Sequence, residues 1–133
     1  MPTEGTKKIL AVLQDLLFTV KIHEAAKRAG LPVEFVKSER DALDKAAAEQ
    51  PALIILDLNF TGLDLNSAGL DVLQLIRALK SGEATKKIGL IGYLSHIQGE
   101  LKQQAQEAGC DTVLARSAFS QNLPQILKRH AGA

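Results

Sequence analysis

Four apolar runs of this 133-residue chain are each followed by polar side chains that could do chemistry. Asp15 follows the first such run, Asp57 the most apolar one, and Ser95 and Arg116 the last two. If the runs are parallel strands, their carboxyl ends share one edge of a sheet, where open α/β proteins bind ligands. A carboxylate at the end of a buried strand, with a cation and a hydroxyl arriving from neighbouring strands, is suited to handling an anion.

Alternating strand and helix patterns position these residues. Between the apolar runs, apolar side chains recur at steps of three and four, which is typical of amphipathic helices. Five strands separated by helices predict a parallel sheet, because parallel neighbours need long crossover connections, and the fold class is therefore α/β. The predicted strands span 8–13, 33–36, 52–56, 88–94 and 112–115.

Helix boundaries follow from local signals. Gly30, with Pro32 after it, ends the first helix, and Ser38 is suited to capping the start of the second. Pro124 fits only the first turn of a helix, so the last helix is predicted to start near Asn122.

Composition narrows the class of protein. Sixteen basic and 15 acidic residues give a net charge of +1, so no field of one sign indicates nucleic acid or a membrane as a partner. Tryptophan is absent and aromatic residues are few, which predicts an aliphatic core. Cys110 is the only cysteine and the most apolar stretch, 51–58, is too short to span a bilayer. We expect one cytoplasmic domain over 1–133, with an ordered core from about 8 to 129.

The span from 8 to about 129 resembles the receiver domain of bacterial response regulators. The resemblance is carried by Leu-Asp-Leu at 56–58 after a buried strand, by Gly-Leu-Asp-Val-Leu at 69–73, and by the segment 109–116. It implies a flavodoxin-like (βα)5 doubly wound sheet with strand order 2-1-3-4-5. It also implies that Asp57 is the phosphoacceptor of a two-component phosphorelay, with a histidine kinase or phosphotransfer protein as partner.

The residues implied to bind a metal depart from the family pattern. Receivers hold Mg²⁺ with the acceptor aspartate and two acidic residues after the first strand, where this chain has Leu13 and Gln14. The remaining metal candidates are Asp15, Asp57 and Asn59. Leucine cannot ligate Mg²⁺ and glutamine offers only a neutral oxygen, so the site is predicted to be weakened or lost. Asp15 is alternatively the N-terminal carboxylate of the first helix.

The residues implied to sense a phosphoryl group also depart from the pattern. In the family, a residue with a hydroxyl group at the end of the fourth strand acts as the switch, and this position aligns with Leu94 here. Its neighbour Ser95 is therefore the candidate for the switch hydroxyl. Alternatively, Ser95 is the N-cap of the fourth helix. Arg116 replaces the usual lysine, and Ser117 the proline after it. Arginine keeps the charge on a longer, forked side chain. It is expected either to contact phosphate or to form a structural ion pair with Asp57.

These observations leave two versions of a signalling module open. Asp57 is phosphorylated, or the domain is a phosphorylation-independent adaptor of the receiver type. In both it is not an enzyme, and its output passes to a protein partner, or to a second copy, through 97–108, 112–115 and 123–129. A flavodoxin-like domain that binds a small ligand at the same strand ends is the rival from another class.

Overall fold

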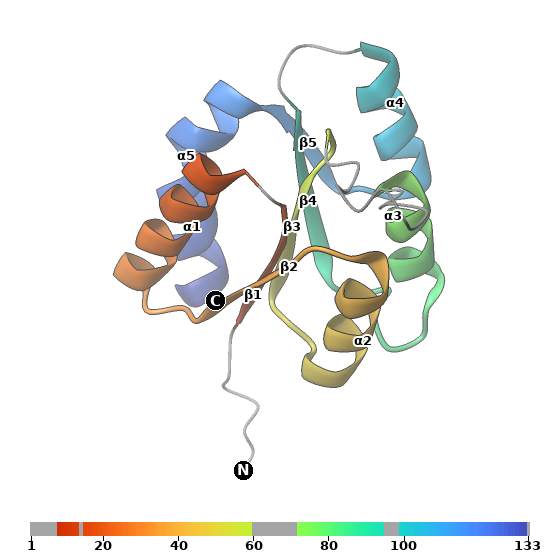
Figure 1. Ribbon diagram of the computed structural model, residues 1–133, viewed down its shortest axis with the longest axis horizontal. Helices are drawn as coiled ribbons and strands as arrows, with labels where there is room; N and C mark the ends of the chain where they lie inside the picture. The colour runs from red at the N-terminus through yellow and green to blue at the C-terminus, as the bar shows by residue number, and fades with distance from the viewer. Residues whose placement is uncertain (1–7, 14, 60–71, 95–98, 133) are drawn as a thin grey trace.

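A five-stranded parallel sheet forms the centre of the molecule, in the order β2-β1-β3-β4-β5 (Figure 1). The computed structural model describes residues 8–13, 15–59, 72–94 and 99–132, and side chains as far as Arg129. The strands are β1 (Ile9–Val12), β2 (Val33–Val36), β3 (Leu53–Asp57), β4 (Gly89–Leu94) and β5 (Thr112–Ala115). The helices are α1 (Leu16–Ala29), α2 (Glu39–Glu49), α3 (Val72–Ser81), α4 (Gly99–Ala108) and α5 (Arg116–Gly132). The predicted fold class and strand order are confirmed.

Helices cover both faces of the sheet. Helices α1 and α5 lie on one face, and α2, α3 and α4 on the other (Figure 1). Because side chains alternate along a strand, β3 sends Leu53 and Ile55 into the α1/α5 layer and Ile54 and Leu56 into the opposite layer. Strand β3 lies between β1 and β4, which places its carboxyl end at the middle of one sheet edge.

The predicted aliphatic core is confirmed for the layer of α2, α3 and α4, whereas the core of the α1/α5 layer also contains three stacked aromatic rings. The three rings, Tyr93 of β4, Phe18 of α1 and Phe119 of α5, form a triangle: the Tyr93 centroid lies 4.9 Å from that of Phe18 and 4.8 Å from that of Phe119, and the two phenylalanine centroids are 6.0 Å apart. Each ring comes from the buried face of its own element, so the fold brings together most of the few aromatic residues the chain has. Stacked rings of this kind contribute about 0.5–1.5 kcal/mol per pair beyond the apolar area they bury.

The predicted helix signals near the start of the chain are confirmed. Ser38 caps α2 by accepting a hydrogen bond from the backbone N–H of Asp41 at 3.1 Å. Gly30 ends α1 in the left-handed conformation, with φ of 77°, which a residue without a Cβ adopts at little cost. Of the residues described, none belongs to a helix long and apolar enough to cross a bilayer.

The predicted start of the last helix is wrong. Helix α5 begins at Arg116, directly after β5, and runs through Pro124. Phe119, Leu123 and Leu127 are buried at steps of four, so the whole length of the helix packs on the sheet and gains apolar burial from its first turn. Pro124 lies on the exposed side, where it removes one backbone hydrogen bond and its ring crowds the backbone carbonyl of the preceding turn. The first part of the motif at 69–73, residues 69–71, lies outside the described residues.

Candidate functional site

Asp57 ends β3 at the edge of the sheet where the strands' carboxyl ends meet. The backbone N–H of Asn59 donates to its Oδ1 at 2.9 Å, which folds the chain back over the carboxylate. The carboxyl group is half-buried, and burial raises its pKa above the ordinary value, opposed by the hydrogen bond from Asn59. No ion pair to Asp57 forms among the residues that the structure describes. Its charge is therefore poorly compensated.

The neighbours of Asp57 across the sheet explain this pKa. Asp57 is the register partner of Tyr93 in β4, and Leu13, which is 1% exposed, directly follows β1 on its other side. Both neighbours pack in the α1/α5 core, so neither solvates a carboxylate. The Tyr93 hydroxyl is itself buried without a hydrogen-bond partner within the described ranges. Its pKa is raised by burial and, secondarily, by the negative charge of Asp57.

Arg116 forms its ion pair with Asp15, and the predicted pair with Asp57 is not formed. The Nη2 atom of Arg116 donates to Oδ2 of Asp15, and the guanidinium carbon lies 4.5 Å from the centroid of the Phe18 ring. A planar guanidinium can stack on an aromatic face and still present its N–H groups to a carboxylate in the ring plane. The ion pair with Asp15 and the contact with Phe18 together hold the Arg116 side chain at the start of α1.

Asp15 uses both carboxylate oxygens in this arrangement. While Oδ2 accepts from Arg116, Oδ1 accepts from the backbone N–H groups of Leu17 at 2.9 Å and Phe18 at 3.4 Å. Asp15 is therefore the N-cap of α1, which confirms the alternative reading of this residue. Its role as a metal ligand stays a prediction, and a cation there would compete with Arg116 for Oδ2.

The described donors near Asp57 do not fit Mg²⁺. The ion prefers six hard oxygen ligands in octahedral geometry. The described side chains include no cluster of three or more acidic, histidine or cysteine residues able to hold a metal. Leu13 occupies the position of one acidic ligand, and Asp15 is already bound to Arg116. Of the remaining candidates, Asp57 is the one carboxylate that no described cation holds, so water would have to supply most of an octahedral set there.

Several predictions fall outside the part of the chain that the structure describes. Ser95, as switch hydroxyl or as N-cap, is among them, as is Gln14. These stay predictions. The sequence did not predict the contribution of Phe18 and Tyr93 to the site. Tyr93 could have been found because β4 register places it beside the aspartate that ends β3.

No family model and no curated protein matches the chain, whereas many solved structures do. The chain is similar to a chemotaxis response regulator of Vibrio cholerae, at 22% identity and a TM-score of 0.74 over 94% of this chain and 98% of the other. It is similar to the receiver domain of a sensor histidine kinase from Pseudomonas aeruginosa, crystallised with magnesium in the active-site cleft (22%, TM-score 0.74, 96% and 98%).

A phosphorylated cyanobacterial phytochrome response regulator is also similar, at 24% identity and a TM-score of 0.71 over 92% of this chain and 89% of the other. At these identities the likeness shows the fold. The chain has the fold of response regulator receiver domains over nearly its whole length.

Proposed function

We propose that this chain is a receiver-type signalling module of two-component systems that works through contacts with other proteins. The observation that carries the proposal is the place of Asp57, a half-buried carboxylate at the end of the central strand of a receiver fold. The partners are a histidine kinase or phosphotransfer protein, a downstream target, or both. We further propose that the module is cytoplasmic and has no enzymatic activity of its own.

Of the two versions, the contacts around Asp57 favour a phosphorylation-independent adaptor. Phosphoryl transfer depends on positioning and on neutralising negative charge. Here the nearby cation, Arg116, is bound to Asp15, and Leu13 stands where a ligand of Mg²⁺ would be needed. The Asp15–Arg116 pair joins the start of α1 to the start of α5, so the surface around the site is held in place without a phosphoryl group.

Phosphorylation of Asp57 remains the second candidate, and one observation favours it. Among the described residues, the Asp57 carboxylate accepts a hydrogen bond from Asn59 through Oδ1, and no cation pairs with it. Its second oxygen can therefore act as the nucleophile towards a phosphoryl donor. The Arg116 side chain could then exchange Asp15 for the new phosphoryl group, because arginine binds phosphate well in a bidentate manner.

Beryllofluoride with millimolar Mg²⁺ separates the two versions. We expect the amide signals of Asn59, Tyr93 and Phe119 in ¹⁵N-labelled protein to stay unchanged, and acetyl phosphate to add no phosphoryl mass. The phosphorylated cyanobacterial relative serves as positive control and an Asp57→Asn variant as negative control. Amide shifts that require both Mg²⁺ and Asp57 would overturn the adaptor version and support the phosphoacceptor.

A further inference from the structure

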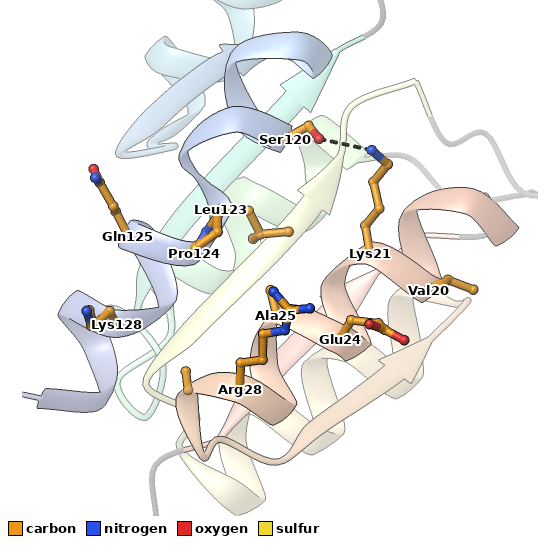
Figure 2. Close-up of a pocket in the computed structure, with 11 residues that line it drawn as sticks. Val20, Lys21, Glu24, Ala25, Arg28, Ser120, Leu123, Pro124, Gln125 and Lys128 are labelled. Atoms are coloured by element: carbon orange, nitrogen blue, oxygen red, sulfur yellow. Dashed lines mark hydrogen bonds between the residues drawn. The ribbon is translucent and has the colours of Figure 1, made fainter.

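A groove of about 610 Å³ runs between α1 and α5 on the outer side of the layer that covers the site (Figure 2). Its lining is largely apolar, because small or short side chains from both helices leave room between them. The apolar lining residues are Val20, Ala25, Ala29, Leu123 and Pro124. The backbone of two packed helices gives such a groove a direction, and a third helix can lie along it.

Basic side chains dominate the rim of this groove. Lys21 and Arg28 project from α1 and Lys128 from α5, and the one acidic lining residue is Glu24 (Figure 2). All four side chains are exposed, so the rim carries three positive charges against one negative charge on a protein whose net charge is only +1. Lys21 also donates to Ser120 Oγ at 3.2 Å across the groove. The rim is therefore a local concentration of positive charge.

An exposed apolar stripe on α1 continues from the groove. Leu16, Leu17 and Val20 are 79%, 61% and 56% exposed, and they are the large hydrophobic side chains that the described surface leaves uncovered. Their spacing of three and four residues puts them on one side of the helix, and Val20 belongs to both stripe and groove. Clustered apolar exposure of this kind marks a surface that another molecule covers.

We infer that the groove between α1 and α5 binds an acidic amphipathic helix of a partner protein. The apolar face of such a helix would cover Val20 and the alanines, and its carboxylates would meet Lys21, Arg28 and Lys128. A second copy of this chain is disfavoured, because an isologous contact brings the same basic rim against itself. Nucleic acid is disfavoured because the groove lacks aromatic side chains and contains the carboxylate of Glu24.

The inference takes its biological meaning from the proposed signalling role but needs no phosphoryl group. The groove shares Leu123, Pro124 and Lys128 of α5 with the expected output surface, and it is completed by α1 in place of α4 and β5. Charge attraction at an exposed rim mainly sets specificity and association rate, whereas the apolar floor supplies affinity. Binding should therefore be weaker at high salt without being abolished.

The probe for this inference is a designed helical peptide of about 18 residues, or roughly five turns, with a leucine stripe flanked by glutamates. Its control carries the same leucines flanked by lysines. When each peptide is added to the full chain, we expect the glutamate peptide to shift the amide signals of Val20, Ala25 and Leu123 and the lysine peptide to leave them unchanged. A chain carrying both Arg28→Glu and Lys128→Glu should bind it about tenfold more weakly.

Lys102→Glu is the matched control, because it reverses an exposed charge on α4 and should leave binding of the peptide unchanged. Equal binding of the lysine peptide, shifts confined to α4 and β5, or binding only to vesicles of phosphatidylglycerol would each overturn the inference. If the charge reversals unfold the chain, binding of the two peptides to the unaltered protein still shows whether the groove prefers an acidic helix. Asp57→Asn should bind the glutamate peptide normally, so failure of the phosphoacceptor is distinguished from failure of the groove.

Discussion

The two ends of the sheet satisfy their charged groups very differently. At the amino ends of the strands, Lys8 is bound to both Glu34 and Glu49, and Lys45 binds Glu34 at 2.6 Å. At the carboxyl ends, Asp57 has no described ion pair. The hydroxyl of its neighbour Tyr93 is buried without a described partner. Uncompensated polar groups are costly and concentrate where function requires them.

A second clamp at the amino ends makes the contrast sharper. Oδ2 of Asp111 accepts from the Leu90 backbone N–H at 2.8 Å and from Lys80 Nζ at 3.0 Å. One carboxylate thereby joins the end of α3, the start of β4 and the turn before β5. The amino ends of the strands thus carry clamps that stabilise the fold. The carboxyl ends combine one ion pair, Asp15–Arg116, with an Asp57 carboxylate that has no described ion pair and a Tyr93 hydroxyl that has no described hydrogen-bond partner.

The largest expected effect comes from removing the second clamp. Asp111→Ala leaves the Leu90 N–H and Lys80 without their acceptor, and we expect a loss of about 1–2 kcal/mol in the free energy of unfolding, since Asp111 is half exposed. Urea denaturation measures it. Asp44→Ala is the matched control, because Asp44 forms only an exposed contact with Arg40, at 4.0 Å, and should cost under about 0.5 kcal/mol. If Asp111→Ala and Asp44→Ala lowered the free energy of unfolding equally, the contacts of Asp111 would not stabilise the amino end of the sheet as argued.

The fold could be predicted from the sequence because its signals are local and agree with one another. Continuous apolar runs, Gly30 and Ser38 gave strands and caps that the structure confirms. Pro124 misled because proline is a local signal, whereas the packing of Phe119 and Leu123 on the sheet is not. Burial along the whole of α5 outweighs one lost hydrogen bond.

The candidate site could be predicted only in part. The position of Asp57 follows from strand order, but the partner of Arg116 depends on where its side chain goes. The expected partners of that arginine were Asp57 and a phosphoryl group, and no sequence signal indicated Asp15. In the folded chain the guanidinium of Arg116 packs on the ring of Phe18, next to Asp15. Phe18 lies 98 residues before Arg116 in the sequence, so no local pattern predicts this contact.

The pH dependence of stability should have opposite signs at the two ends. Ion pairs with Lys45 and Lys8 lower the Glu34 pKa from 4.5 to about 2, so its stabilisation is complete above 4.5 and is lost as the pH falls towards 2. Burial raises the pKa of Asp57, so its ionised form destabilises the fold and the penalty disappears on protonation at lower pH.

Glu34→Gln should therefore be less stable than the unaltered chain at pH 7, by at most about 1 kcal/mol, and equal to it near pH 2. Asp57→Asn keeps the acceptor for the Asn59 N–H and should be the more stable protein at pH 7, with the difference shrinking as the pH falls. Urea denaturation of the three proteins between acid and neutral pH tests both signs. If both variants shifted stability in the same direction at pH 7, the contrast between the ends would be wrong.

The smallest expected effect is also the most specific to the carboxyl end. Tyr93→Phe removes a buried hydroxyl that has no described partner and keeps the ring stacked against Phe18 and Phe119. A buried polar group without a hydrogen bond has lost its hydration and gained no partner, so it does not stabilise the fold. Its removal should therefore change the free energy of unfolding by less than about 0.5 kcal/mol, or increase it. A loss above about 1 kcal/mol in urea denaturation would show that the hydroxyl is hydrogen-bonded. In that case the Tyr93 hydroxyl has a hydrogen-bond partner, and the contrast between the two ends of the sheet rests on Asp57.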